Sequence, residues 1–223
     1  MIKAVIFDMD GVLIDSEPCY QRATEEYLAS YGVRLTREQL LRFPGRRFLK
    51  VMEEIGGEIP EENYRRIIDE FVPWTIDFEK ALRCEVPQLF RDLREMGLTI
   101  AIASNSIQEK LNLFLRRCRL EEYVELVSSG ADLGKGKPEP DIYLYTCGKL
   151  GLAPSECIAV EDSDCGLQAA TGAGCRVVCL IDSRFAFRQE NADIWIHNLR
   201  ELPEVIKKVE DEKAGFGNTW LYG

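Results

Sequence analysis

Asp8 and Asp10 follow an apolar run near the start of the chain, in the segment FDMDG. Side chains two residues apart point to the same side of an extended backbone, and in a loop two such carboxylates can converge on one site. A carboxylate can serve as nucleophile, acid, base or ligand of a hard cation. The pair alone fits a structural turn equally well. A calcium-binding EF-hand loop starting at Asp8 is excluded, because Val12 and Cys19 stand where carboxylate ligands are needed.

Further polar residues end two later apolar runs. Ser104 and Asn105 end the segment IAIASN, and Glu161 and Asp162 end IAVED. Lys137 lies between them, in the segment GKGKPEPD. In a doubly wound sheet, strand ends of this kind meet where the strand order reverses. The sequence therefore predicts one site that combines carboxylates, a hydroxyl group and an ammonium group.

This combination fits phosphoryl transfer. A carboxylate such as that of Asp8 can attack phosphorus and form an acyl phosphate. Attack of one anion on another requires charge neutralisation, which a hard cation supplies. Mg²⁺ prefers oxygen ligands, and Asp8 and Asp162 offer them, with Glu161 as a further candidate. We therefore predict Mg²⁺ as the cofactor.

The remaining polar groups suit the transferred group and the proton. Lys137 and Ser104 can bind the other phosphoryl oxygens. Asp10 can protonate the leaving alcohol and afterwards activate water.

Five short apolar runs predict buried strands, since they are rich in Val and Ile and show no clean alternation. They are Ala4–Phe7, Leu98–Ala103, Val124–Val127, Cys157–Val160 and Arg176–Ile181, with a weaker sixth run at Asp193–His197. Helical patterns separate the later runs, at Val86–Met96, Gln108–Cys118, Asp141–Leu150 and Cys165–Ala173. The alternation predicts an α/β fold with a doubly wound parallel sheet.

Between the first two strands lies a stretch with helical patterns and no convincing strand. The patterns cover Ala23–Tyr31, Arg37–Leu41, Phe48–Ile55 and Glu61–Phe78. We predict that residues 15–86 form a helical subdomain, inserted after the first strand of a core made of residues 1–14 and 87–223.

Composition limits the partners. The net charge is −10, with 38 acidic and 28 basic residues, which disfavours nucleic acid and anionic membrane surfaces. The chain has one histidine, His197, and no C-x-x-C pair among its eight cysteines, so we expect reduced thiols and no zinc site. The first apolar run is too short for a signal peptide, and no apolar stretch reaches the length of a membrane span. We expect a cytoplasmic protein, monomeric or weakly homo-oligomeric, that acts on a small phosphorylated metabolite.

Four segments together resemble a known family. VIFDMDGVLIDS, IAIASNS, GKPEPDIY and IAVEDSDCGLQAATGAG are similar, in this order, to the four motifs of the haloacid dehalogenase-like hydrolase superfamily. The similarity is greatest to the β-phosphoglucomutase-like and sugar-phosphatase branch, and it covers nearly the whole chain. The resemblance implies a Rossmann-like core, and it implies that the helical insert is a cap domain.

The resemblance also implies roles for the matching residues. Asp8 is the expected nucleophile and Asp10 the expected acid and base. The expected ligands of Mg²⁺ are the side chains of Asp8 and Asp162, the backbone oxygen of Asp10, and Glu161. Ser104 and Lys137 are expected to bind the phosphoryl group, with Asn105 assisting near Ser104. The presence of Asp10 disfavours dehalogenation, because the dehalogenases lack that aspartate.

Cations elsewhere in the chain have two interpretations. Arg46, Arg47 and Lys50 lie near a Pro-Gly pair in the insert. The equivalent loop of related enzymes reaches over the active site, so Arg47 is a candidate substrate-binding residue, with ordinary surface charge as the alternative. The cations that follow the second strand are expected on solvated helix faces; they are Lys110, Arg116, Arg117 and Arg119.

The sequence thus predicts a magnesium-dependent phosphatase that hydrolyses a small sugar or sugar-acid phosphate through an aspartyl-phosphate. One alternative is a mutase of the β-phosphoglucomutase type. Mutases of that type usually carry a histidine in the first cap helix, where this chain has Tyr20, so hydrolysis is favoured. A non-catalytic binding protein on the same fold is a weaker alternative, because every expected reactive position is filled.

Overall fold

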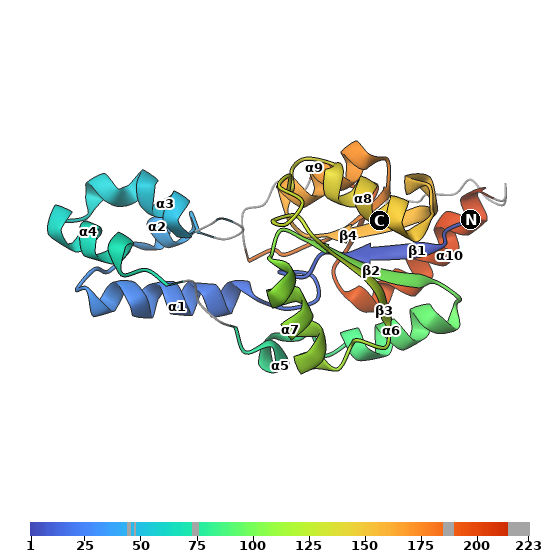
Figure 1. Cartoon of the computed structure of the whole chain (residues 1–223), viewed down its shortest axis with the longest axis horizontal. Coiled ribbons are helices and arrows are strands. Elements are labelled where there is room, and N and C mark those ends of the chain that lie inside the picture. The colour runs from blue at the N-terminus through green and yellow to red at the C-terminus, as the bar shows by residue number, and fades with distance from the viewer. Residues whose placement is uncertain (44–45, 47, 73–75, 185–189, 214–223) are drawn as a thin grey trace. The chain divides into compact units, whose positions relative to one another are not determined.

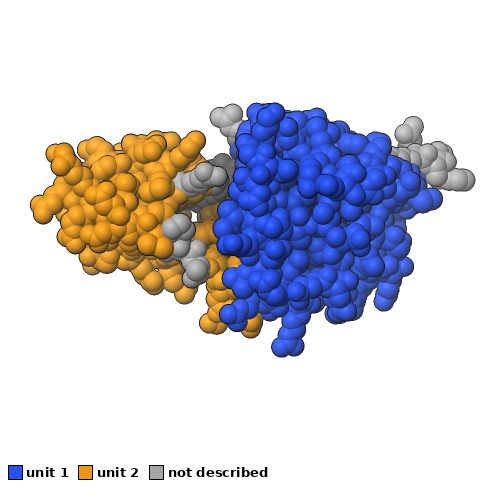
Figure 2. All heavy atoms as spheres, viewed as in Figure 1, with its two compact units in different colours: residues 1–14, 82–223 blue, residues 15–81 orange. Residues whose placement is uncertain are grey.

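The computed structural model describes residues 1–223 except 44–45, 47, 73–75, 185–189 and 214–223. The chain divides into two compact units (Figure 2), one of residues 1–14 with 82–223 and one of residues 15–81. The second boundary lies before the predicted one at residue 86. The reason is that Leu82 bridges to Ile14, and the backbone N–H of Arg83 donates to the carbonyl of Leu13 at 3.0 Å.

A six-stranded sheet forms the centre of the larger unit. Its strands are β1 (Ala4–Phe7), β2 (Thr99–Ser104), β3 (Val124–Ser129), β4 (Cys157–Glu161), β5 (Arg176–Leu180) and β6 (Ile194–Ile196). All neighbouring pairs are parallel, and the order is β3-β2-β1-β4-β5-β6 (Figure 1). The predicted doubly wound parallel sheet is therefore confirmed. The strand order reverses between β1 and β4, where such sheets bind ligands.

The register brings the ends of the central strands to one level. Phe7, the last residue of β1, pairs with Ile102 of β2 and with Val160 of β4. Asp8 and Glu161 therefore follow these paired positions directly on two adjacent strands, at the carboxyl edge of the sheet.

Helices cover both faces of the sheet. They are α6 (Val86–Glu95), α7 (Gln108–Cys118), α8 (Asp141–Leu150), α9 (Asp164–Ala173) and α10 (Leu202–Lys213), with 3₁₀ turns at Pro154–Glu156 and Leu199–Glu201. Figure 1 shows α8 and α9 on one face and α6, α7 and α10 on the other. Burial of both faces explains why the strands read as continuous apolar runs.

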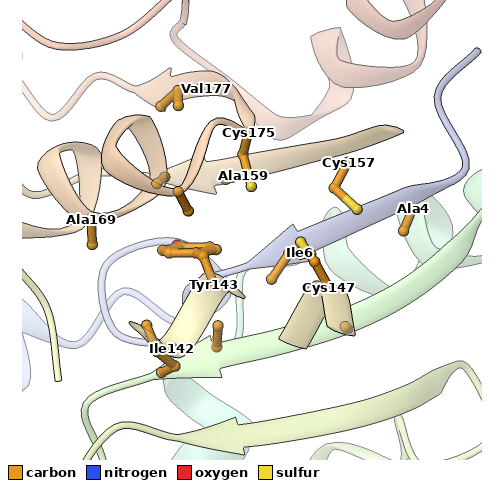
Figure 3. Close-up of a cluster of buried hydrophobic side chains, with 14 of the residues drawn as sticks. Ala4, Ile6, Ile142, Tyr143, Cys147, Cys157, Ala159, Ala169, Cys175 and Val177 are labelled. Carbon is orange, nitrogen blue, oxygen red and sulfur yellow. The ribbon is translucent and has the colours of Figure 1, made fainter. Parts of the chain in front are cut away.

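The face beneath α8 and α9 is lined by small side chains. Ala4, Ala101 and Ala159 are fully buried there, in the cluster that also holds Tyr143 of α8 (Figure 3). The small strand residues leave room for the large phenol ring of Tyr143. On the opposite face, larger side chains meet, and the rings of Phe7 and Phe90 lie 5.4 Å apart.

Sulfur atoms fill part of the same cluster. Cys147, Cys157 and Cys175 are buried in it (Figure 3), and all eight cysteines of the chain are free thiols. In this packing cysteine acts as a small apolar residue. Cys19 and Cys84, by contrast, are exposed.

The smaller unit is helical. It contains α1 (Glu17–Ser30), α2 (Arg37–Leu40), α3 (Phe48–Ile55), α4 (Glu61–Asp69) and α5 (Phe78–Ala81), with a 3₁₀ turn at Gly56–Glu58. Its own core is built around Phe48, Met52 and Ile55 of α3. The helix predicted over Glu61–Phe78 is shorter in the structure, because α4 ends at Asp69 and the next helix, α5, begins only at Phe78.

The described part of this unit contains no strand, as the sequence predicts. Across both units, the described helices include none that combines the length and the apolarity needed to span a membrane.

Candidate active site

Asp8 lies one residue beyond β1, at the point where the strand order reverses. Its backbone N–H donates to the carbonyl of Val160 on β4 at 3.0 Å, which fixes the start of the loop. The side chain is buried, with the residue only 7% exposed, and its Oδ1 atom accepts a hydrogen bond from Nζ of Lys137. The predicted nucleophile is therefore a buried, ion-paired carboxylate.

Lys137 brings its ammonium group to three oxygen atoms. Besides Asp8, it contacts Oε1 of Glu161 at 2.5 Å and the carbonyl of Ala103 at 2.7 Å. The lysine backbone is held by Asn105, which accepts from the Lys137 N–H at 2.8 Å and donates to its carbonyl at 3.1 Å. This amide therefore fixes the loop that carries the lysine.

Three buried carboxylates form one cluster. Oxygen atoms of Asp8, Glu161 and Asp162 all lie within 4.8 Å of one another. Oε1 of Glu161 also accepts the hydroxyl of Tyr143 at 2.5 Å. The other oxygen, Oε2 of Glu161, is buried and has no hydrogen-bond partner among the described residues. A buried carboxylate oxygen without a donor is costly unless a cation satisfies it.

Two glycines make room for these carboxylates. A Cβ atom on Gly11 would lie 1.9 Å from Oδ2 of Asp162, and Gly11 has a φ of +88°, which disfavours other residues. A Cβ atom on Gly166 of α9 would lie 2.0 Å from Oε2 of Glu161. The glycines of the first and fourth motifs are thus required by close approach to acidic side chains.

Burial sets the electrostatics of the cluster. It raises the pKa of Asp8 to about 7; Lys137 opposes this rise, and Glu161 and Asp10 add to it. Burial alone would lower the pKa of Lys137, but Asp8 and Glu161 raise it, so the lysine stays charged. Burial, followed by the charge of Glu161, raises the pKa of Tyr143. The phenol therefore stays protonated and donates a hydrogen bond to Glu161.

The residues present fit a magnesium ion. Three carboxylates against one ammonium leave a net charge of −2 when all are ionised. The ligand atoms are oxygens only, as Mg²⁺ prefers, and one of them is Oε2 of Glu161, for which the described part of the chain offers no hydrogen-bond donor. Asp8, Glu161 and Asp162 are the side chains that would hold the ion. That the backbone oxygen of Asp10 is a further ligand stays a prediction.

Asp10 is oriented by a second set of contacts. Its carboxylate accepts a hydrogen bond from the hydroxyl of Ser106 at 3.1 Å, and both oxygens lie within 3.2 Å of Nζ of Lys110. The expectation that Lys110 lies on a solvated helix face is wrong. Its side chain is only 25% exposed and forms an ion pair with Asp10.

Ser104 is the last residue of β2 and lies next to Ser106. It is 2% exposed, and its Oγ atom accepts the backbone N–H of Ser106 at 3.2 Å. Binding of phosphate by Ser104 or Asn105 stays a prediction, and the contacts described for Asn105 are to the backbone of Lys137.

The candidate arginines belong to the helical unit. Arg47 lies outside the described residues. Its neighbour Arg46 donates from both terminal nitrogens to the carboxylate of Glu54 on α3, with Nη1 at 3.0 Å from Oε2. This pairing raises the pKa of Arg46 and lowers that of Glu54.

Sequence reasoning missed three residues of the site, namely Ser106, Lys110 and Tyr143. A signal existed for Lys110, which stands in the first turn of α7. A cation is disfavoured at that end of a helix unless an anion lies nearby. Ser106 precedes Lys110 by four residues, a spacing that brings side chains together around a helix start. Tyr143 gave no signal, because an apolar helical pattern does not show where a hydroxyl points.

Comparison with known proteins defines the class. The family model described as haloacid dehalogenase-like hydrolase matches residues 5–180. Protein CbbY of Cereibacter sphaeroides is 30% identical over 219 residues, covering 91% of this chain and 94% of the relative. Hexitol phosphatase B of Escherichia coli is 32% identical over 216 residues, covering 90% and 94%.

A solved structure agrees with these relatives. It is a HAD family hydrolase from Deinococcus radiodurans with bound phosphate and sodium, with a TM-score of 0.75, 27% identity and coverage of 94% of this chain and 96% of that chain. The chain belongs to the haloacid dehalogenase-like hydrolase family, so the predicted resemblance is confirmed.

Proposed function

We propose that this protein is a magnesium-dependent phosphatase that hydrolyses a small sugar or sugar-acid phosphate through an aspartyl-phosphate on Asp8. Its membership of a hydrolase family with relatives named as phosphatases confirms the prediction of a phosphatase enzyme. The mechanism, metal and substrate class are the proposal. One observation carries it, namely a buried Asp8 carboxylate within 4.8 Å of two further buried carboxylates and in contact with Lys137.

In the first step, an oxygen of Asp8 attacks the phosphorus atom of the ester. A P–O bond to Asp8 forms, the P–O bond to the alcohol breaks, and the alcohol leaves with a proton from Asp10. Lys137 stays charged next to Asp8 and can stabilise negative charge on the phosphoryl oxygens.

In the second step, water replaces the alcohol. Asp10, now ionised, accepts a proton from the water, whose oxygen attacks phosphorus. The bond between phosphorus and Asp8 breaks, inorganic phosphate leaves, and Asp8 and Asp10 return to their starting states. The same group serves as acid and then as base, so both steps depend on its position.

When bound by Asp8, Glu161 and Asp162, Mg²⁺ would neutralise the charge that otherwise repels an anionic substrate. The chain prepares this site by burying the carboxylates and by holding Oε1 of Glu161 with Tyr143 and Lys137. Oε2 of Glu161 has no donor among the residues that the structure describes.

The substrate class rests on the relatives. Hexitol phosphatase B and a phosphorylated carbohydrates phosphatase of Thermotoga maritima carry names that specify phosphorylated carbohydrates. We propose a substrate of the same chemical class here. The helical unit is proposed to act as a cap, and Arg47 to bind a second anionic group of the substrate.

A panel of sugar and sugar-acid phosphates tests the proposal. Phosphate release is measured with Mg²⁺ and with excess chelator, for the wild type and for Asp162→Ala. We expect hydrolysis only with Mg²⁺ and a loss of activity in the variant. Mass spectrometry of acid-quenched enzyme should show one phosphoryl group on the peptide that contains Asp8. Full activity in chelator would overturn the metal requirement, and an isomerised product without phosphate release would indicate a mutase.

A further inference from the structure

The Asp10 carboxylate is held from two sides by groups of one short segment. Ser106 donates its hydroxyl to Oδ2 of Asp10 at 3.1 Å, and Nζ of Lys110 lies 3.0 Å from the same oxygen. Lys110 also contacts the Ser106 hydroxyl at 3.1 Å, which closes a triangle of hydrogen bonds. Both side chains of the ion pair are about three-quarters buried. A contact with this burial is more persistent than an exposed ion pair.

The segment that carries these donors is itself fixed. The carbonyl of Ser106 accepts the hydroxyl of Ser129 on β3 at 2.9 Å, and its N–H donates to Ser104 at 3.2 Å. Ser106 is therefore tied to two strands. Lys110 follows in the first turn of α7, where the helix dipole disfavours a cation unless an anion compensates. Asp10 is that anion.

We propose that Lys110 is a positioning residue, which together with Ser106 orients the Asp10 carboxylate for proton transfer. The inference rests on the proposed function, because it requires Asp10 to act as acid and base. Lys110 acts through its contact with Asp10, and we assign it no contact with the substrate or the metal. Its loss should leave attack by Asp8 possible but misplace the proton donor and acceptor.

This role predicts a dependence on the leaving group. An aryl phosphate such as 4-nitrophenyl phosphate releases a stable anion and needs little help from an acid, whereas an alkyl phosphate of the sugar-phosphate panel needs its leaving oxygen protonated. Hydrolysis of the phosphoenzyme needs the base with either substrate. The two substrates therefore separate the first step from the second.

The experiment compares the wild type with Lys110→Met and Lys110→Arg in stopped flow and at steady state. For Lys110→Met we expect kcat on the alkyl phosphate to fall about tenfold or more, a part of the ~10²–10⁴-fold that proton transfer contributes. With the aryl phosphate we expect a rapid burst of nitrophenolate followed by slow turnover, because only the second step is impaired. Lys110→Arg should restore most of the rate.

Two further variants make the result decisive. Arg117→Met removes an exposed cation from the same helix and should match the wild type. Asp10→Asn should slow both steps more strongly than Lys110→Met. Equal losses on both substrates and in both steps, with a lower melting temperature, would make Lys110 merely structural. If Asp10→Asn is slow but Lys110→Met turns over at the wild-type rate, the inference about Lys110 is overturned while the proposed mechanism stands. A wild-type rate for Asp10→Asn would overturn the proposed mechanism and this inference with it.

Discussion

The hydroxyl of Tyr143 donates to Oε1 of Glu161 at 2.5 Å, across the interface between α8 and β4. The same oxygen contacts Lys137, whose Nζ lies 5.4 Å from the centre of the Tyr143 ring. One aromatic side chain therefore touches both the acidic cluster and the cation that balances it. Because Glu161 is fully buried, its orientation depends on these two donors.

Tyr143→Phe should weaken both folding and metal binding. The ring remains to fill the core, but Oε1 of Glu161 loses one of its two donors and keeps only Lys137. A hydrogen bond to a charged group contributes about 1.5–3 kcal/mol. Urea unfolding in chelator measures the stability, and isothermal titration calorimetry measures Mg²⁺ affinity. Tyr145→Phe, on the same helix but 39% exposed, is the control and should change neither. An unaltered Mg²⁺ affinity in Tyr143→Phe would deny the tyrosine a part in shaping the metal site.

Asp8→Asn should abolish turnover, because an amide cannot form the acyl phosphate. It should also alter how stability depends on pH in metal-free protein. Burial raises the pKa of Asp8 from 3.8 to about 7, so between these values the folded state holds a proton that the unfolded state has lost. Asp8 therefore contributes stability at low pH that disappears as the pH rises through about 7.

The variant lacks this titration, so its stability relative to the wild type should increase from pH 4 to pH 7. The difference should be on the order of a few kcal/mol. Parallel chemical denaturation of both proteins in chelator at several pH values measures it. A constant difference would mean that Asp8 titrates normally in the folded protein.

Gly166→Ala should damage the acidic cluster. The added Cβ would lie 2.0 Å from Oε2 of Glu161, so either the carboxylate or α9 must move. We expect a loss of roughly 1–3 kcal/mol in stability, as for other overpacked core sites, together with weaker Mg²⁺ binding. Gly172→Ala is the control on the same helix, since its Cβ would meet only ordinary contacts of 3.5 Å. It should be neutral, or stabilising by up to about 1 kcal/mol, because alanine favours a helix.

Arg47→Ala tests the expected role of the helical unit in substrate choice. The planar guanidinium suits a carboxylate or phosphate, so its loss should lower kcat/KM roughly tenfold or more, as for a charge-assisted hydrogen bond of ~1.5–3 kcal/mol. The expected effect applies to the best sugar or sugar-acid phosphate of the panel. An aryl phosphate should be hydrolysed nearly as before. Lack of any change with both substrates would leave Arg47 as surface charge.

Most of the core architecture could be predicted from the sequence, because parallel strands that are buried on both faces leave continuous apolar runs. The residues that end these runs identified Asp8, Glu161 and Asp162, which the structure brings together. Their arrangement follows from topology, since β1 and β4 are neighbours that end at one level.

Side-chain contacts between distant segments were harder to predict from the sequence. Lys110 was expected to be exposed, because a lysine in a helix usually is. Its place in the first turn of α7 indicated a nearby anion but did not show that this anion is Asp10. Asn105 was expected near phosphate, but the contacts described for its amide hold the Lys137 backbone, thirty-two residues away. Such contacts depend on how loops meet in space rather than on any periodic pattern.

The central position of β1 has a consequence for how the active unit is made. Asp8 is separated by 129 residues from Lys137, and β1 hydrogen-bonds to β4, which ends only at Glu161. Contacts between residues so distant in the chain form slowly, because a long loop must close first. During synthesis β1 must therefore wait, without this neighbour, until β4 has left the ribosome. A nascent chain that ends before β4 would carry Asp8 but neither Glu161 nor Asp162, so the acidic cluster cannot form until both of these residues have been synthesised.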